Sequence, residues 1–121
     1  MIQKMNLAEK FGLIDDYWHP RVGGTINDFH LKLAKIKGEF IWHHHETEDE
    51  LFLVVKGHLR INLRDQEALI LNAGECAIIP HGVEHQPVAE EECHIVMLEP
   101  AGTLNTGNVH DERTVEHLDT I

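Results

Sequence analysis

The chain has 121 residues, which is enough for one ordinary domain with its own core. Its 21 acidic residues against 10 basic ones give a formal net charge of −11, so neither nucleic acid nor an anionic membrane surface is expected as a partner. The longest clearly apolar run, 51–55, is far shorter than a membrane span of roughly 20 residues. With no secretory signal at its start and no CxxC spacing between Cys76 and Cys93, we expect a cytoplasmic protein with reduced thiols.

The two ends of the chain differ in pattern from its middle. Residues 1–24 are expected to form an N-terminal segment with one short helix within 6–14, where Asn6 is a suitable N-cap and Glu9 follows three residues later. The Pro- and Gly-containing stretch 20–24 then ends the helical periodicity. Residues 103–121 form a polar tail, expected to pack along the domain or a partner, or to be partly disordered.

Between these ends, residues 25–102 read as short strands separated by turns. Apolar and polar residues alternate through 29–33 and 58–64, which is typical of half-buried strands. Residues 90–92 are three consecutive glutamates and are expected to form a solvated loop. The predicted strands are 29–33, 40–45, 51–55, 58–64, 68–71, 76–79 and 93–98. So many short strands with almost no helix favour an all-β protein, an antiparallel sandwich or barrel.

The arrangement of the histidines, 11 in all, is the main functional signal. On a strand, residues two apart share a face, so His43 and His45 point together while His44 points away. If 51–55 return as the adjacent strand, Glu50 lies beside that pair, and His85 follows the turn at 80–82. Three neutral imidazoles and one carboxylate suit one divalent transition metal: iron, manganese, nickel, cobalt or zinc. Four such ligands on an octahedral ion leave two positions open.

The spacing of these residues resembles the two signature motifs of the cupin superfamily. The matching segments are His43-x-His45-x4-Glu50-x6-Gly57 and Gly74-x5-Pro80-x-Gly82-x2-His85. The resemblance implies a small jelly-roll β-barrel, or double-stranded β-helix, with a metal in its mouth. It also implies that the glycines serve turns and that Pro80 fixes the loop that presents the last histidine. The metal ligands implied by the resemblance are His43, His45, Glu50 and His85.

Two positions depart from the family pattern. One residue fewer than usual separates Gly38 from His43, and Ala89 stands where an Asn often closes the second motif. Neither position is a ligand. The missing Asn weakens any expectation about hydrogen bonds that support the ligands.

Two further histidines are candidates for a catalytic role in moving protons. His94 shares the parity of Val96 and Leu98 on the last predicted strand, which could place it inside the barrel. His81 lies at the turn before His85 and could line the mouth. For both, an ordinary core or surface histidine is the alternative interpretation.

The outward face of the predicted strand pair is also apolar. If His43, His45 and Glu50 point inward, alternation turns a second set of side chains outward, and such a face is usually covered. The outward set is Trp42, Leu51, Leu53 and Val55. The cover could be the N-terminal segment, through Leu7, Phe11 and Ile14, or a second subunit. We expect a homodimer through this face.

Two classes of function remain. The first is a metal-dependent enzyme acting on a small polar molecule, either a dioxygenase or a sugar isomerase or epimerase, because the resemblance includes cupin dioxygenases and proteins compared with phosphomannose isomerases. The second is a non-catalytic module that binds a small molecule or a metal through the same residues. We expect the first class, and a mainly apolar inner wall, predicted at Ile41, Phe52 and Val54, keeps the second class as the alternative. Motifs for phosphate loops, dinucleotide binding, serine hydrolases and zinc proteases are absent from the sequence.

Overall fold

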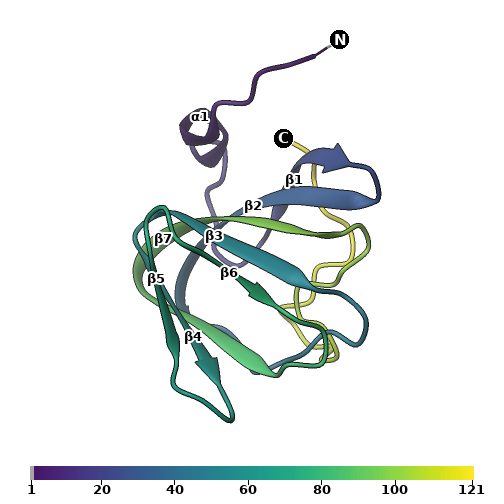
Figure 1. The fold of residues 1–121 in the computed structure, drawn as a ribbon. Helices are drawn as coiled ribbons and strands as arrows, with labels where there is room; N and C mark the ends of the chain where they lie inside the picture. The colour runs from purple at the N-terminus through teal and green to yellow at the C-terminus, as the bar shows by residue number, and fades with distance from the viewer. Residues whose placement is uncertain (1) are drawn as a thin grey trace.

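In a computed structural model that describes residues 2–121, the chain forms an antiparallel jelly roll with one short helix (Figure 1). The elements are α1 (Leu7–Phe11), β1 (Arg21–Ile26), β2 (Phe29–Glu39), β3 (Glu50–Lys56), β4 (His58–Leu63), β5 (Leu69–Asn72), β6 (Cys76–Ile79) and β7 (His85–Pro100). This architecture confirms the all-β antiparallel fold expected from the sequence. The Asn6 side chain accepts a hydrogen bond from the Glu9 backbone N–H at 3.0 Å, which caps α1 as expected.

Two long strands, β2 and β7, connect the layers of the jelly roll. The strand order in the main sheet is β1-β2-β7-β3-β6, and β4 pairs with both β5 and β7. The first residues of β7 pair with β4, whereas residues 94–98 pair with β3. Strand β7 therefore passes from one layer to the other (Figure 1), and His85 is its first residue.

Residues 90–92, expected as a loop, lie within β7 instead. Along the pairing of β2 with β7, Ile36 faces Cys93 but Gly38 faces Ala89, so the three glutamates form an irregular bulge on the β7 side. All three are exposed. Their charge is therefore solvated, as the sequence indicated, while the strand continues on both sides.

Two other segments differ from the sequence prediction. Strand β1 occupies the stretch in which Pro and Gly predicted a break. A Cβ at Gly23 would approach Leu33 Cδ1 to 2.5 Å, so a larger residue there would displace the Leu33 side chain. Residues 40–45 form no regular strand. Within this segment, the only β-type pairing is an isolated antiparallel bridge between His43 and His85.

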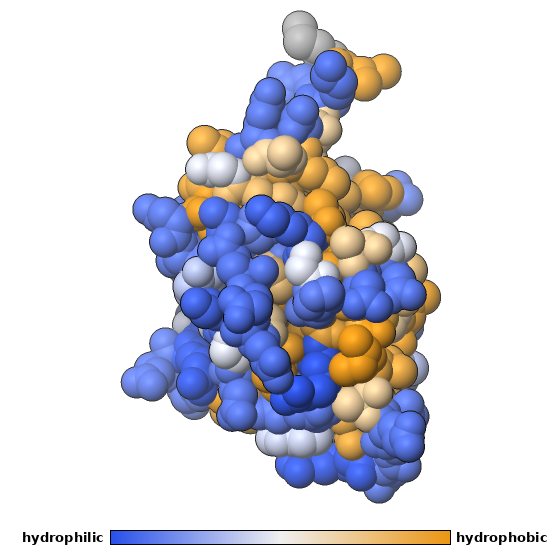
Figure 2. All heavy atoms as spheres, turned by 90° about the vertical axis from the view of Figure 1, so that its left-hand side faces the viewer, coloured by the Kyte–Doolittle hydropathy of each residue, from blue (hydrophilic) through white to orange (hydrophobic). Residues whose placement is uncertain are grey.

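The sheet has an apolar cluster on each of its two faces. The inner cluster includes Ile36, Phe52, Leu59, Ile95 and Met97. The outer cluster is formed by Phe11, Ile14, Leu33 and Val96, with Leu53 and Val55 packed against it. The N-terminal segment thus covers part of the outer face, as α1 above the sheet shows in Figure 1. In Figure 2, apolar residues gather below the projecting N-terminal residues, and hydrophilic ones cover most of the left and lower surface.

The C-terminal tail, residues 103–121, packs along the barrel. Thr120 forms a parallel bridge with Val22, and the Thr106 side chain is fully buried. The Asn108 backbone N–H donates to the His44 carbonyl at 2.9 Å. A Cβ at Gly107, whose φ is +56°, would lie only 2.2 Å from the His44 oxygen, so glycine is needed where the tail meets the segment that carries the histidines. Within residues 2–121, no helix is long and apolar enough to cross a membrane.

Candidate metal centre

The fold brings together the four side chains that the sequence pattern singled out. His43 and His45 lie in the irregular segment between β2 and β3, Glu50 is the first residue of β3, and His85 is the first residue of β7. All four are buried, with relative exposures between 0 and 3%. Their ligand atoms all lie within 4.8 Å of one another.

The polar atoms of this cluster lack the hydrogen bonds that burial normally demands. Glu50 Oε1 is 2.9 Å from His45 Nε2 and 3.3 Å from His85 Nε2, yet none of these atoms has a partner in hydrogen-bond geometry within the described part of the chain. Unsatisfied buried polar atoms cost about 1–3 kcal/mol each. One cation bound among them would satisfy all three at once, so the residues fit a divalent metal ion.

Backbone carbonyls fix the orientation of two of the imidazoles. His43 Nδ1 donates to the Ile41 carbonyl and His85 Nδ1 donates to the Val83 carbonyl, each at 2.9 Å. Because a carbonyl oxygen can only accept, both rings carry their proton on Nδ1. The Nε2 lone pairs are then free for a metal, as is usual for metal-bound histidines.

The charges at the centre suit ligation. Burial, together with the neighbouring His85, lowers the pKa of His43 to about 4, so this imidazole is neutral at pH 7. For Glu50, burial raises the pKa, but contacts with Glu99, His45 and His85 outweigh it and hold the pKa well below its ordinary value. Neutral imidazoles beside an ionised carboxylate form the donor set that a divalent first-row metal requires.

A buried ion pair lies directly behind the carboxylate ligand. Lys32 Nζ is 2.9 Å from Glu99 Oε1, both side chains are 2% exposed, and Lys32 also donates to the Thr103 carbonyl at 3.1 Å. Burial and the adjacent Glu50 raise the pKa of Glu99, against the opposing effect of Lys32. Sequence reasoning missed both residues. The available signal was parity, since Glu99 alternates in phase with the inward-facing Ile95 and Met97.

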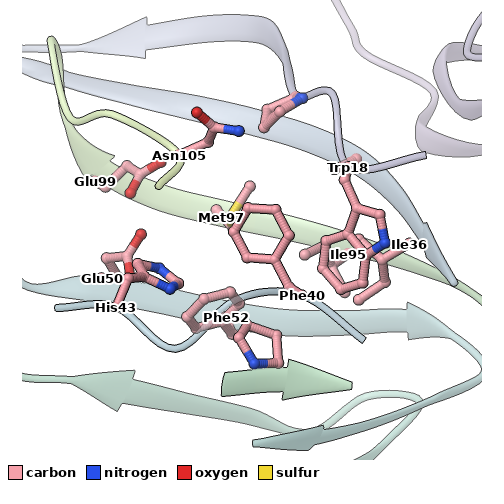
Figure 3. A pocket seen from close by; sticks show the side chains of 13 residues that line it. Trp18, Ile36, Phe40, His43, Glu50, Phe52, Ile95, Met97, Glu99 and Asn105 are labelled. Atoms are coloured by element: carbon pink, nitrogen blue, oxygen red, sulfur yellow. The ribbon is translucent and has the colours of Figure 1, made fainter. Parts of the chain in front are cut away.

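A partly open cavity adjoins the centre. In Figure 3, His43, Glu50, Glu99 and Asn105 lie at one end of it, and Trp18, Ile36 and Ile95 lie at the other. Phe40, Phe52 and Met97 lie between these ends. Of the residues predicted for the inner wall, Phe52 lines this cavity, Val54 is buried in the inner cluster, and Ile41 contributes to neither.

The remaining candidate histidines lie away from the cavity. His94 is on the opposite face of β7, where its ring stacks on Phe11 at 4.7 Å and its Nε2 is 2.8 Å from Glu92. On β7, Ile95, Met97 and Glu99 face inward, so His94, one residue before Ile95, faces outward. His81 is exposed and its Nδ1 is 2.9 Å from Asp49 Oδ1. His44 points away from the centre, with its Nε2 2.7 Å from Glu46.

Comparison with known proteins identifies relatives of the whole arrangement. A family model described as "Cupin domain" matches residues 30–99. A solved cupin-2 domain containing protein from Shewanella frigidimarina NCIMB 400 is 49% identical, with a TM-score of 0.77, and the match covers 79% of this chain and 93% of that one. The uncharacterized protein YdbB of Bacillus subtilis (strain 168) is 43% identical over 61 residues. That match covers 50% of this chain and 54% of YdbB, so it spans about half of the relative's length.

A more distant likeness is one of fold alone. Hydroquinone 1,2-dioxygenase from Sphingomonas sp. TTNP3, solved with 4-hydroxybenzoate bound, has a TM-score of 0.72 at 16% identity. The match covers 80% of this chain but only 32% of that enzyme.

Proposed function

This chain belongs to the cupin domain family, and from that premise we propose that it is a metal-dependent enzyme acting on a small molecule. The observation that carries the proposal is the centre itself. Three imidazoles and one carboxylate are buried together, and a cavity opens beside them. Within residues 2–121, the facing atoms of His45, Glu50 and His85 have no hydrogen-bond partner. The proposed metal ligands are His43, His45, Glu50 and His85.

A divalent first-row ion held by these residues would supply Lewis-acid activation and a template for the substrate. The chain itself contributes orientation and charge. The Ile41 and Val83 carbonyls fix two imidazole rings, and the Lys32–Glu99 pair supports the Glu50 carboxylate from behind. The tail, through Asn105, and the apolar wall limit the access of water to the reacting end of the cavity.

Oxygen-dependent chemistry is our preferred reaction class over sugar isomerisation. Isomerisation moves a proton between carbon atoms and needs a positioned acid or base beyond the metal ligands. His94 and His81 lie outside the cavity, which leaves Glu99 as the one further ionisable side chain lining it within residues 2–121, and Glu99 is already engaged with Lys32. A fold-level likeness to hydroquinone 1,2-dioxygenase agrees with this choice but does not decide it.

The second candidate function is a non-catalytic module that binds a small molecule. The apolar wall favours it, because Phe40, Phe52 and Met97 bind well without taking part in proton transfer. The same metal centre would then serve recognition alone.

Oxygen consumption separates the two candidates. Protein loaded with iron or manganese is mixed with a panel of small diketones, phenols and sugars, and dissolved oxygen is followed with an electrode. We expect substrate-dependent uptake that disappears in His45→Ala and persists in the matched control His44→Ala. Tight binding of one compound without oxygen consumption would contradict the enzyme and support the binding module.

We further propose that two copies associate through the outer face of β3 and β6. Leu51 pairs with Ile78 across these strands, so the two side chains share that face, and Ile78 is 66% exposed. Strand β6 also ends the main sheet, which places this apolar surface at its edge. Burial against a second copy would remove it from water.

A further inference from the structure

We infer that the cavity beside the metal centre selects a small molecule with a flat apolar ring, oriented so that an oxygen-bearing group faces the four ligands. This inference rests on the proposed function, because the oxygen-bearing group is expected only if the four residues hold a metal ion that it can bind. It adds the chemical class of the substrate, which neither the ligands nor the family membership specifies.

The two ends of the cavity differ in chemistry. Its polar lining residues, His43, Glu50, Glu99 and Asn105, all lie at the end next to the centre (Figure 3). The rest of the wall consists of aromatic and aliphatic side chains. A molecule bound along the cavity therefore has partners for polar atoms at one end only. A sugar, which carries hydroxyls around its whole ring, would leave several of them buried without a hydrogen bond.

Aromatic rings extend from the far end of the cavity to the imidazoles. Trp18 stacks on Phe40 with centroids 4.7 Å apart and planes 19° apart, and Phe40 meets the His43 ring edge-on at 5.5 Å. From the other side, Phe52 meets the His85 ring at 6.2 Å. A small molecule in contact with these rings is therefore also next to the proposed metal-binding atoms. Aromatic walls favour flat rings over puckered ones of the same size, because stacked and edge-on contacts require planarity.

The position of Trp18 is maintained at a conformational cost. It is one of two residues other than glycine with a positive φ, +59°, among those the structure describes, and this region is unfavourable for a bulky side chain. Two hydrogen bonds hold it there, from its backbone N–H to the Lys35 carbonyl at 2.9 Å and from its Nε1 to the Lys37 carbonyl at 2.8 Å. Strain that the surrounding structure enforces is characteristic of functional positions. Here it places an indole from the segment between α1 and β1 against the cavity.

Three hydroxamates with the same metal-binding head test the inference. Benzohydroxamate has a flat apolar ring, cyclohexanecarbohydroxamate has a puckered apolar ring of similar size, and acetohydroxamate has only a methyl group. Each is titrated by calorimetry into zinc-loaded protein, and zinc content is measured on the same sample. We expect benzohydroxamate to bind about tenfold more tightly than acetohydroxamate and several-fold more tightly than the cyclohexane compound.

The two tryptophans of the chain show where the ring of the bound molecule lies, because Trp18 lines the cavity and Trp42 serves as a control. Trp42 lies outside the cavity, with the Arg64 guanidinium 3.8 Å from its ring. In zinc-loaded Trp42→Phe the remaining indole fluorescence comes from Trp18, and benzohydroxamate is expected to change it, whereas acetohydroxamate is not. Trp18→Leu should abolish the preference for the flat ring while Trp42→Phe retains it. Phe40→Leu, which leaves the backbone at Trp18 intact, should weaken the same preference.

The outcomes distinguish the inference from the function on which it rests. Failure of the protein to retain zinc, or failure of all three hydroxamates to bind the zinc-loaded protein, would overturn the proposed function. Equal affinities for the three hydroxamates would overturn the inference and leave the metal centre standing. A flat-ring preference that survives in Trp18→Leu and in Phe40→Leu alike would likewise overturn the inference.

Discussion

The two faces of the main sheet bury different kinds of side chain. Outside, Phe11, Ile14, Leu33 and Val96 form an apolar cluster under the N-terminal segment. Inside, the same strands bury charged residues, with Lys32 next to Leu33 and Glu99 two positions after Met97. Burying charge destabilises a fold unless the charge is paired or serves a site. The comparison indicates that the outer face contributes apolar packing alone, whereas the inner face combines the larger apolar cluster with buried charged residues beside the candidate metal centre.

The largest expected effect is loss of the metal on changing an inward-facing ligand. His45→Ala removes an imidazole that is 2.9 Å from Glu50 Oε1, and metal content per chain should fall from one ion to nearly none. His44→Ala is the matched control one residue away, because its side chain contacts Glu46 instead. Elemental analysis after purification in metal-containing buffer measures both. Equal losses of metal in the two variants would show that His45 does not face the centre while His44 faces away from it.

The next largest effect is expected at the ion pair behind the centre. Lys32→Met leaves the Glu99 carboxyl buried without its partner and should lower the free energy of unfolding by about 3–5 kcal/mol. Lys37→Met, on an exposed part of β2, should change it by less than about 0.5 kcal/mol. Urea denaturation of the metal-free proteins measures both.

The double change Lys32→Met with Glu99→Leu sharpens the result. It removes both buried charges and should recover most of the lost stability. A Lys32→Met protein as stable as wild type would mean that Glu99 does not depend on this lysine.

The sequence predicted the fold class and the convergence of the four side chains well, because both depend on short-range spacing. His43 and His45 are two apart, and turns such as the one before His85 depend on local residues. It failed where several elements cooperate. Lys32 and Glu99 are far apart in the sequence, and a lone charge within an alternating strand looks solvent-exposed until the topology pairs the two strands.

The same cause limits what the sequence predicts at Gly23 and His94. Gly23 predicted a break because the sequence alone does not show the neighbouring Leu33 side chain that requires a small residue. For His94, the apolar residues in its phase, Val96 and Leu98, left an inward direction open beside an ordinary core or surface position. The structure shows the ordinary position, because the N-terminal segment makes the outer face of β7 apolar too. Where both faces of a strand are covered, alternation sorts the residues into two sets but does not show which set faces inward.

A smaller effect is expected from pH. Because burial lowers the pKa of His43 to about 4 from 6.5, the unfolded chain binds a proton that the folded chain does not as pH falls from 6.5 towards 4. The free energy of unfolding of metal-free protein should therefore decrease over that window, by up to about 3 kcal/mol from this group, and be constant above it. His43→Gln should lose this component of the slope. An identical pH dependence in both proteins would contradict a depressed pKa, and metal-loaded protein should release its ion below about pH 6.

The smallest effect on the folded chain, and the sharpest test of the outer face, concerns Ile78. It is 66% exposed beside Leu51 at the sheet edge, so Ile78→Glu should change the free energy of unfolding of one chain by only about 0.5 kcal/mol. A glutamate there would, however, place a charge inside the proposed dimer interface, and sedimentation at micromolar concentration should shift from dimer to monomer. Ile70→Glu is the matched control, since Ile70 is 56% exposed on β5 in the other layer and should leave the dimer intact. A wild-type chain that sediments as a monomer would overturn the proposed dimer, and Ile78 would then remain exposed to solvent.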